Sequence, residues 1–377
     1  EPCRSVGHLE HLECGRRRHF CARPSPPPPS QSHCRLGLWM PAYSALASGG
    51  AVQPPRAACF LLASFAAGSG LWLLLGSQKE EQPDVASPRT QRSARSAAQL
   101  AKWFRWQAVL ASEAAAHTAS PGKGSLALWG DSITESWRGT SYGTPAGRAN
   151  GTPAVLAQTL ARRWPSPAVL AISGDQTQHL LWRLGDGGEL PPPLASDGAL
   201  TAVVMIGTNN LGAGHLPGPT AEGVLAVARE YLRRSRGRLL LCALLPRGDG
   251  AELLPRLCPP RCDRRGAPFR SFMPAVEKVN QRLREEAGGG RLSVDFPGRV
   301  SYVDCGGPFR AGGGRREGGE EEAEEVVVRL MPDRLHPNPE GHQLLARCLE
   351  TALLGKGWGV QPTGYSRLGL PLGGSAP

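Results

Sequence analysis

Residues 125–138 read Ser125-Leu-Ala-Leu-Trp-Gly-Asp-Ser-Ile-Thr-Glu-Ser-Trp-Arg138, an apolar run followed by a polar turn. The run Leu126–Trp129 is typical of a strand that is buried on both faces of a sheet. It ends at Gly130-Asp131-Ser132, where a strand is expected to give way to a loop or helix. Because open α/β sheets bind ligands at the carboxyl ends of their strands, Ser132 is a candidate nucleophile. Gly-Asp-Ser is also common in ordinary turns, so this stretch alone leaves both interpretations open.

Apolar runs and amphipathic segments alternate along the chain after this stretch. Further strands are predicted at residues 169–172, 202–206, 238–245 and 300–304. Helices are predicted at residues 97–110, 220–236, 269–286 and 339–354, the last with Asn338 as its cap and Pro339 in its first turn. Such alternation predicts an α/β fold with a mainly parallel, five-stranded sheet that helices cover on both faces.

The composition bounds the domain organisation and the class of partner. The chain of 377 residues contains 48 glycines and 35 prolines, many of them outside the periodic segments, which favours one domain with appendages. The 43 basic residues outnumber the 32 acidic ones and give a net charge of +11, but they are scattered and do not alternate with aromatic residues. The sequence therefore argues against nucleic-acid binding. Ten cysteines in a chain of this length do not indicate a disulfide scaffold.

The N-terminal residues predict a leader and a membrane-related segment. Residues 1–56 are rich in Pro, Ser and Arg and predict a disordered, basic leader, within which Met40 is an alternative start. Residues 57–76 carry no charge and end in a leucine-rich run. At about 1.5 Å per residue this segment would just cross a hydrocarbon core of about 30 Å. We expect a signal anchor or a signal peptide, because a buried helix would normally show a polar face.

The charges that flank residues 57–76 suggest an orientation. Arg56 precedes the segment and Lys79-Glu80-Glu81 follows it, which favours a cytoplasmic N-terminus. The rest of the chain would then be lumenal or extracellular and anchored to the membrane through residues 57–76. A plastid or mitochondrial presequence is the alternative, since the leader is rich in Arg and Ser and poor in acidic residues.

The remaining boundaries follow from composition. The polar residues 77–96 predict a linker, residues 97–355 the folded domain, and the Gly- and Pro-rich residues 356–377 a disordered tail. Within the domain, the insertion 247–267 holds Cys258 and Cys262, which would form a disulfide if the domain is lumenal. No second Cys/His pair lies near them to complete a metal site. The insertion 312–325 contains six glutamates and predicts a solvated loop, because it lacks the ligand spacing of calcium loops.

Two residues before the last helix are able to activate Ser132. A serine hydroxyl needs a base at neutral pH, and an imidazole suits that role. The imidazole in turn needs a carboxylate that holds its tautomer and stabilises its protonated form. Asp333 and His336 lie three residues apart in Asp333-Arg-Leu-His336 and would supply both groups from one loop. A surface turn before a Pro-capped helix is the structural alternative.

Two other loops carry donors for the oxyanion that forms during acyl transfer. Gly174 follows the second predicted strand in Ile-Ser-Gly-Asp, and Asn209 follows the third in Gly-Thr-Asn-Asn. The backbone amides of Ser132 and Gly174 and the side-chain amide of Asn209 would donate to the oxyanion. The absence of a Cβ at Gly174 would let a substrate approach the backbone. Each loop alone could be an ordinary turn, but their order at strand ends favours one shared catalytic edge.

These motifs together resemble the SGNH (GDSL-type) hydrolase superfamily. Its four hallmark positions match Ser132, Gly174, Asn209 and His336. Within the superfamily, residues 173–184, 207–210, 244–248 and 303–306 are similar to the catalytic subunits of the intracellular platelet-activating factor acetylhydrolase. The resemblance covers about residues 98–354 and implies a flavodoxin-like, three-layer αβα sandwich.

The resemblance also implies a site and an activity. It implies a catalytic triad of Ser132, His336 and Asp333, an oxyanion hole of Ser132, Gly174 and Asn209, and no metal or organic cofactor. The implied activity is that of a serine esterase, which cleaves a carboxylic ester with a short or acetyl chain through an acyl-enzyme. Lysophospholipids, acetylated lipids and O-acetylated glycans are the candidate substrates.

Some features leave alternatives open. An acyltransferase would share the acyl-serine intermediate, and a noncatalytic interaction module could use the same fold. The sequence does not exclude a homo-oligomer. The chain also departs from the family pattern: Leu170 and Ala171 stand where relatives often carry Asn and Gly, and His342 stands where many carry Tyr.

Overall fold

The computed structural model describes residues 81–118, 124–312 and 325–355. The predicted leader 1–56, the uncharged segment 57–76, residues 77–80 and the predicted tail 356–377 lie outside the described residues. The same holds for the acidic insertion, apart from its two end residues. In the part of the chain that is described, no helix is long and apolar enough to cross a membrane.

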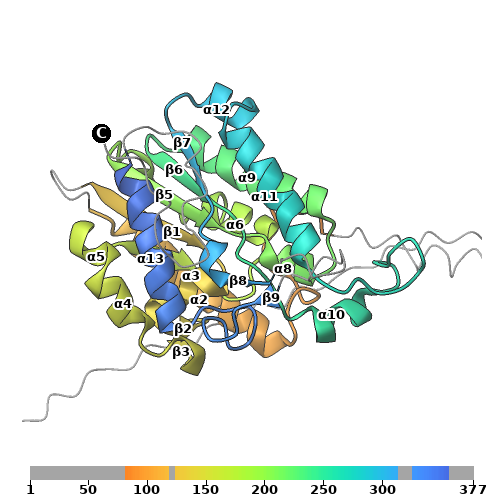
Figure 1. The fold of residues 1–377 in the computed structure, drawn as a ribbon. Helices are drawn as coiled ribbons and strands as arrows, with labels where there is room; N and C mark the ends of the chain where they lie inside the picture. The colour runs from red at the N-terminus through yellow and green to blue at the C-terminus, as the bar shows by residue number, and fades with distance from the viewer. Residues whose placement is uncertain (1–80, 119–123, 313–324, 356–377) are drawn as a thin grey trace, which may run out of the picture. The chain divides into compact units, whose positions relative to one another are not determined.

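Five parallel strands form the central sheet, in the order β4-β1-β5-β6-β7 (Figure 1). They are β1 (Ser125–Gly130), β4 (Ala168–Ala171), β5 (Leu200–Met205), β6 (Arg238–Cys242) and β7 (Val300–Val303). Every pair of neighbours in this sheet is parallel. The first strand therefore lies between the second and the third, which is the flavodoxin-like order. The predicted α/β fold with a five-stranded parallel sheet is confirmed.

The side chains of each strand alternate between two hydrophobic cores. In β1, Ala127 and Trp129 belong to one core, and Leu126 and Leu128 belong to the other. This alternation is expected, because successive side chains of a strand point to opposite faces of the sheet. All four are buried, so the sheet is covered on both faces.

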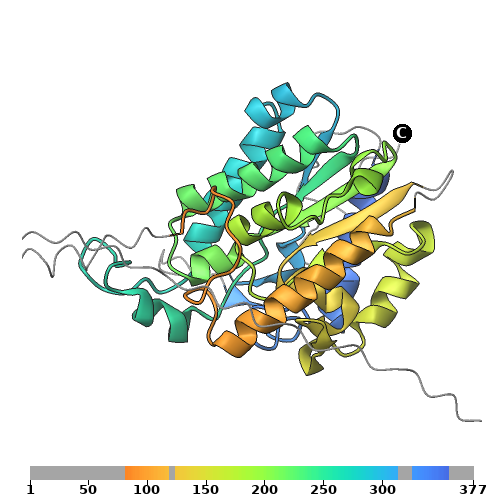
Figure 2. The same cartoon turned by 180° about the vertical axis from the view of Figure 1, so that it is seen from behind.

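Helices cover each face of the sheet. The first core lies under α2 (Ala97–Ala115), α6 (Thr177–Leu184), α9 (Pro217–Arg234) and α11 (Met273–Ala287). The second lies under α4 (Thr152–Gln158), α5 (Leu160–Arg163) and α13 (Pro339–Leu354). In Figure 1, α13 lies in front of the sheet, and Figure 2 shows the orange α2 in front when the molecule is seen from behind. The domain is thus a three-layer αβα sandwich.

Shorter elements connect these layers. The short helices are α3 (Ser132–Glu135), α7 (Pro192–Ala195), α8 (Thr208–Gly212), α10 (Gly250–Leu257) and α12 (Arg291–Asp295). Single 3₁₀ turns occur at η1 (Ser136–Arg138), η2 (Gly147–Ala149) and η3 (Gly307–Phe309). Two small antiparallel hairpins pair β2 (Thr140–Ser141) with β3 (Thr144–Pro145) and β8 (Arg310–Ala311) with β9 (Glu325–Val326).

The fourth strand ends earlier than its apolar pattern predicts. The run was expected to continue to Leu245, but β6 ends at Cys242. Beyond that point the backbone of Leu244 pairs with a side chain instead of a strand. Its N–H donates to Oδ1 of Asn280 at 2.7 Å, and its carbonyl accepts from Nδ2 of Asn280 at 3.0 Å. The residues after β6 stay buried because α11 supplies these hydrogen bonds.

The helix ends follow their local sequence. Asn338 caps α13 as predicted, since its Oδ1 accepts a hydrogen bond of 3.0 Å from the N–H of Gly341. The helix expected from Phe269 begins only at Met273, with Pro274 in its first turn, where proline is favoured. The helix expected to end at Leu110 continues to Ala115.

Residues 81–96, the described part of the predicted linker, contact the N-terminal half of α6 (Figure 2). The hydroxyl of Thr177 donates to the carbonyl of Pro83 at 2.7 Å. The carboxylate of Glu81 lies 3.6 Å from Nε2 of the buried His179. This imidazole lowers the pKa of Glu81 to about 2. A polar segment that predicts a linker therefore makes specific contacts with the domain.

Two disulfides are present in the described part of the chain. Cys258 is bonded to Cys262, the pair that the sequence singles out. Cys305 is bonded to Cys348, 43 residues further along, and joins the loop after β7 to α13. The second bond was not predicted, because nothing in the local sequence links two cysteines so far apart.

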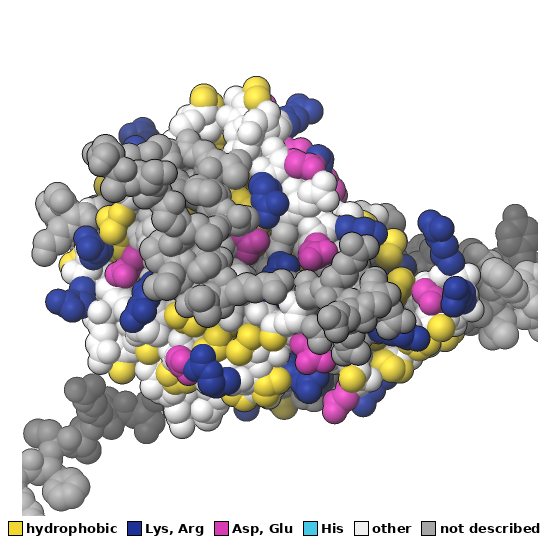
Figure 3. Space-filling model, viewed as in Figure 1, with side chains coloured by type: hydrophobic (Ala, Val, Ile, Leu, Met, Phe, Trp, Pro, Cys, Tyr) yellow, Lys and Arg dark blue, Asp and Glu magenta, His cyan; other side chains and the backbone are white. Residues whose placement is uncertain are grey.

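Charged side chains are dispersed over the face drawn in Figure 3. Lys and Arg side chains stand singly or in small groups, with Asp and Glu among them. No continuous basic stripe crosses the described atoms of this face. The picture agrees with the scattered basic residues of the sequence.

Candidate active site

Ser132, His336 and Asp333 form a hydrogen-bonded chain. Ser132 begins α3 directly after β1, and its Oγ lies 2.8 Å from Nε2 of His336. Nδ1 of His336 lies 2.6 Å from Oδ2 of Asp333. This is the arrangement in which a carboxylate orients an imidazole and the imidazole accepts the proton of a serine. The three residues that the sequence predicts as a triad are thus in contact.

A tight turn holds Asp333 and His336 in place. Oδ1 of Asp333 accepts hydrogen bonds from the backbone N–H groups of Leu335 at 3.0 Å and His336 at 2.7 Å. Arg334 takes a φ of 61°, in the left-handed region, and its carbonyl accepts a bond of 2.9 Å from the N–H of Gly248. One carboxylate oxygen therefore shapes the loop while the other contacts the imidazole.

The environment of Asp333 keeps its carboxyl ionised. Partial burial by itself would raise the pKa of Asp333. The hydrogen bond from the His336 ring, the backbone N–H groups of His336 and Leu335, and the charge of the ring together outweigh this effect. The pKa of Asp333 consequently lies well below its usual range. A permanently charged carboxylate suits the role of stabilising a protonated imidazole.

The predicted oxyanion donors lie in loops that hydrogen bonds join to one another. Nδ2 of Asn209, in α8, donates to the carbonyl of Asp175 at 2.9 Å and to Oδ2 of Asp131 at 3.2 Å. These acceptors are the chain neighbours of Gly174 and Ser132. Gly174 has a φ of 78°, a conformation that residues with a Cβ rarely adopt. The structure therefore brings the loops of Ser132, Gly174 and Asn209 to one edge of the sheet.

Asp131 is a buried acid in direct contact with this site, and the sequence motifs predicted no role for it. Its Oδ1 accepts from the N–H of Ile133 at 3.0 Å, which caps α3. Burial raises the pKa of Asp131 to about 6, although the bond from Ile133 and the nearby His336 oppose the shift. The position of an Asp between the strand and the serine is the signal that could have drawn attention to it.

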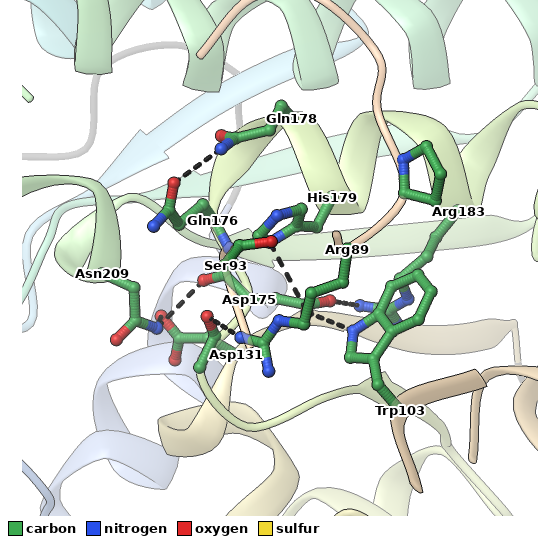
Figure 4. A network of polar contacts seen from close by, with 12 residues as sticks. Arg89, Ser93, Trp103, Asp131, Asp175, Gln176, Gln178, His179, Arg183 and Asn209 are labelled. Carbon is green, nitrogen blue, oxygen red and sulfur yellow. Dashed lines mark hydrogen bonds and ion pairs between the residues drawn. The ribbon is translucent and has the colours of Figure 1, made fainter. Parts of the chain in front are cut away.

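Asp175 organises a buried polar network behind the Gly174 loop (Figure 4). Its side chain accepts from Nε1 of Trp103 at 2.6 Å and pairs with Nη1 of Arg183 at 2.9 Å. Arg183 also pairs with Glu189, at 2.8 and 2.6 Å. All three charged residues are fully buried. Figure 4 shows Asp175 between Asn209 on one side and Arg183 and Trp103 on the other, so that one residue links the site to the core.

Glu135, in α3, connects the Gly174 loop to the β2–β3 hairpin. Its Oε2 accepts from the N–H of Ser173 at 2.7 Å and from the hydroxyl of Ser173 at 2.6 Å. Its Oε1 accepts from the N–H of Gly143 at 2.9 Å and from the hydroxyl of Thr140 at 2.9 Å. Glu135 is fully buried, and these four hydrogen bonds all come from neutral donors. The carboxylate holds two loops in a fixed relation to Ser132.

His342, which departs from the family pattern, packs inside the protein. Its Nε2 lies 3.2 Å from the carbonyl oxygen of Ile133, and its ring meets that of Trp137 edge to face at 4.6 Å. Burial lowers the pKa of His342 below its usual value. The side chain joins α13 directly to α3. His342 therefore makes a polar contact between the helix after His336 and the helix that begins with Ser132.

Comparison with known families agrees with this geometry. Residues 128–344 match the model of the GDSL-like Lipase/Acylhydrolase family, a span that is more than half of the chain. All five predicted site residues fall within it. The chain belongs to this family. The recognition made from the motifs is therefore confirmed, while the roles of the individual residues stay predictions.

Three solved structures are similar to this family member at low identity. The first is a protein of Streptococcus pneumoniae provisionally described as a platelet activating factor, with 18% identity, a TM-score of 0.45, and coverage of 67% of this chain and 94% of that chain. The second is a mutant of Axe2, an acetyl-xylooligosaccharide esterase of Geobacillus stearothermophilus, with 17% identity, a TM-score of 0.37, and coverage of 63% and 97%. The third, a member of the lipolytic G-D-S-L family from Veillonella parvula, has 15% identity, a TM-score of 0.37, and coverage of 61% and 99%. No curated protein matches the chain.

The described residues of this family member hold no group of three or more His, Cys, Asp or Glu side chains placed to bind a metal ion. The expectation that neither a metal nor an organic cofactor takes part stays a prediction. The groups that are in contact, a hydroxyl, an imidazole, a carboxylate and several N–H donors, are those that acyl transfer uses.

Proposed function

We propose that this member of the GDSL-like family is a serine esterase that hydrolyses carboxylic esters with short acyl chains. The observation that carries the proposal is the hydrogen-bonded chain from Ser132 through His336 to Asp333. Family membership supports an ester-hydrolase chemistry. The preference for short or acetyl chains rests on the motif likeness to the platelet-activating factor acetylhydrolase subunits.

The reaction follows from the contacts of the three residues. Ser132 Oγ attacks the ester carbonyl carbon while Nε2 of His336 accepts the hydroxyl proton. The tetrahedral intermediate collapses, the bond to the alcohol oxygen breaks, and His336 returns the proton to the leaving alcohol. Water then attacks the acyl-serine, with His336 again as base, and releases the carboxylic acid. Asp333 holds the imidazole with Nε2 facing Ser132 in every step.

The developing oxyanion needs donors that are already in place. In the proposed mechanism, the backbone N–H groups of Ser132 and Gly174 and the Nδ2 group of Asn209 supply them. One such donor is worth about 3–4 kcal/mol of transition-state stabilisation. Nδ2 of Asn209 has two N–H groups, and both are engaged in the structure, one with the carbonyl of Asp175 at 2.9 Å and one with Oδ2 of Asp131 at 3.2 Å. The bond to Asp175 fixes the direction of the amide, and in the proposed mechanism the longer bond to Asp131 is exchanged for the bond to the oxyanion.

The test compares the full chain with Ser132→Ala on p-nitrophenyl acetate. The matched control is Ser293→Ala, on α12, whose hydroxyl donates only to the carbonyl of Gly290. We expect Ser132→Ala to lose essentially all activity and Ser293→Ala to retain it. Equal rates for wild type and Ser132→Ala would exclude Ser132 as the nucleophile.

Two further measurements separate the alternatives. A fluorophosphonate should label wild type and not Ser132→Ala, whereas a noncatalytic module would not be labelled at all. If an added alcohol captures the acyl group in preference to water, the protein is an acyltransferase. Product analysis with competing alcohols of different chain length therefore decides between hydrolysis and transfer.

We also propose that the domain lies in an oxidising compartment, lumenal or extracellular. The two disulfides, Cys258–Cys262 and Cys305–Cys348, support this location, because such bonds persist outside reducing compartments. An ester of a lipid or a glycan on that side of the membrane would then be the substrate. Imaging of the tagged full-length protein, with a thiol-trapping assay in cells, tests the location. Free thiols at these four cysteines in cells would contradict it.

A further inference from the structure

Arg89 lies at the Gly174 loop although it belongs to neither the family match nor the central sandwich. The family match begins at residue 128, and Arg89 stands in the polar segment 81–96. Its Nη2 donates to the carbonyl of Gly174, and its Nη1 donates to the hydroxyl of Tyr142. Only 4% of the residue is exposed. A residue from outside the matched region therefore contacts the loop of a predicted oxyanion donor.

The charge of Arg89 is buried without an acidic partner. Three arginines are buried in the described part of the chain: Arg89, Arg183 and Arg247. Arg183 pairs with Asp175 and Glu189, and Arg247 pairs with Asp249. Among the described residues, Arg89 has two neutral hydrogen-bond acceptors and the ring of Tyr142, 5.7 Å from its guanidinium carbon, but no carboxylate partner, and its Nε has no hydrogen-bond partner.

Burying the charge of Arg89 without an acidic partner is unfavourable unless another negative charge interacts with it. A buried charge is normally paired with an opposite charge, because an ion that is removed from water loses its favourable hydration. A hydroxyl and a carbonyl compensate only part of this cost. A negative charge that develops nearby during a reaction would make the interaction favourable at that moment.

The Arg89 guanidinium lies so close to the backbone of Gly174 that a side chain at this position would collide with it. A Cβ added to Gly174 would lie 2.7 Å from Nη2 of Arg89 and 3.4 Å from the hydroxyl oxygen of Tyr142. The guanidinium therefore packs against the face of Gly174 that lacks a side chain. By binding the carbonyl, it also restricts the peptide between Gly174 and Asp175, whose own carbonyl accepts from Asn209. The Arg89 guanidinium thus binds the chain between the N–H of Gly174 and the Asp175 carbonyl that holds Asn209.

The hydroxyl of Tyr142 accepts the second hydrogen bond of the Arg89 guanidinium. Tyr142 lies in the turn of the β2–β3 hairpin with a φ of 53°, a conformation that bulky residues rarely adopt. Glu135 fixes this turn through the N–H of Gly143. The Tyr142 hydroxyl also accepts from Nε2 of Gln99 at 3.0 Å. Gly143 also has a positive φ, of 71°, so the two residues together form the tight turn that joins β2 to β3.

We propose that Arg89 is a positioning residue of the oxyanion hole, which fixes the Gly174–Asp175 peptide directly after the Gly174 N–H that would donate to the oxyanion, and places a buried positive charge at that loop. This inference rests on the proposed esterase function. The segment 81–96 is then a part of the active site that the chain adds to the family fold. The fork geometry matters as well as the charge, because Gly174 and Tyr142 are bound by different nitrogens of one planar group.

The test measures kcat and KM for p-nitrophenyl acetate in full-chain variants. Arg89→Met keeps the length of the side chain and removes the charge and both hydrogen bonds. We expect kcat to fall about 10- to 100-fold with little change in KM, somewhat less than the loss for a deleted oxyanion donor. Arg89→Lys keeps the charge but not the fork, and we expect an intermediate kcat. The control is Arg92→Met, an exposed residue of the same segment, which should match wild type.

Chemical rescue distinguishes positioning from a purely structural role. Guanidinium or methylguanidinium ions should restore part of the kcat of Arg89→Ala and have no effect on Arg92→Met. Sodium chloride at the same concentration should not rescue. If Arg89→Met does not fold, Tyr142→Phe, which removes one anchor of the fork, should still lower kcat severalfold with a wild-type melting temperature.

The outcomes separate the inference from the proposed function. A wild-type protein that hydrolyses the ester, together with a folded Arg89→Met variant of equal kcat, would overturn the inference alone. The inference also fails if Arg89→Ala is inactive but folded and no guanidinium compound restores any activity. A wild-type protein that neither hydrolyses the ester nor reacts with a fluorophosphonate would overturn the proposed function, and the inference with it.

Discussion

Oγ of Ser132 and Nε2 of His336 lie 2.8 Å apart, although 204 positions separate the two residues in the chain. Ser132 is placed by β1, the second strand in the order of the sheet, and His336 by the turn before α13. A second contact joins the same two elements, since the ring of His342 meets the carbonyl of Ile133 at 3.2 Å. The proposed nucleophile and the proposed base are therefore held together by the contact of α13 with α3.

Replacing Asp333 with Asn should leave the fold intact and remove most of the activity. An amide in contact with Nδ1 of His336 favours the wrong tautomer and cannot stabilise the protonated ring. We expect kcat to fall about 10⁴-fold, with the proton of the imidazole held away from its working position. Steady-state kinetics on p-nitrophenyl acetate measures the loss. Asp186→Asn, at an exposed acid, is the control, and a kcat within tenfold of wild type for Asp333→Asn would contradict the assigned role.

Asp131 should make stability depend on pH in a defined direction. Its pKa is about 6 in the folded protein, because of burial, and about 3.8 in an unfolded chain. A raised acid pKa means that the stabilisation is complete below about pH 4 and is lost as the pH rises towards 6. Asp131→Asn cannot ionise. Relative to wild type, its free energy of unfolding should therefore increase between pH 4 and pH 7, by up to about 3 kcal/mol, so that the variant becomes the more stable protein.

Urea unfolding at pH 4, 5, 6 and 7 measures this difference. Asp295→Asn, an exposed acid on α12, should show a nearly constant difference from wild type over the same range. A constant difference for Asp131→Asn as well would show that the carboxyl titrates normally in the folded state.

Arg183→Met should destabilise the protein strongly. The substitution leaves Asp175 and Glu189 buried without their partner, and breaking one side of a buried ion pair costs about 3–5 kcal/mol. Arg233→Met, where the arginine is exposed, should change the free energy of unfolding by less than about 0.5 kcal/mol. Denaturant unfolding of both variants provides the comparison. Similar values for the two would mean that the buried network contributes little to stability.

The two disulfides should contribute unequally to stability. The Cys305–Cys348 bond closes a loop of 43 residues, for which chain entropy predicts about 4 kcal/mol, whereas the Cys258–Cys262 bond spans only 4 and should contribute about 2 kcal/mol. Double alanine variants of each pair, compared by urea unfolding, measure the two contributions. Loss of the Cys305–Cys348 bond should also lower activity, because the bond anchors α13 and the turn that holds His336 directly precedes α13. A larger loss for the Cys258–Cys262 variant would contradict this order.

Most of the fold could be predicted from local patterns. Each of the five strands is a short apolar run, and the alternation with amphipathic helices implies a covered parallel sheet. The contact of Ser132, His336 and Asp333 could be predicted as well, because Ser132 follows a strand and Asp333 and His336 share one loop; their catalytic roles stay predictions. The end of β6 could not, since the partner of Leu244 is a side chain of α11 that local sequence does not reveal.

The surroundings of the site were largely missed. Asp131, Glu135 and Asp175 are acids inside or next to the recognised motifs, and their burial is known only once the loops are folded together. No sequence pattern indicated a role for Arg89, because an arginine in a polar, Ser-rich segment is typical of a solvated linker.

The order of residues along the chain therefore specified the layers, the approximate positions of the strands and the groups able to carry out acyl transfer. These depend on periodicity and on neighbours a few positions apart, which any stretch of sequence displays. The tertiary structure alone decided which distant groups meet: Arg89 with Gly174, Asn209 with Asp131, and Cys305 with Cys348. Such contacts form because the sheet brings separate loops to one edge and excludes water there, and no local pattern encodes that proximity.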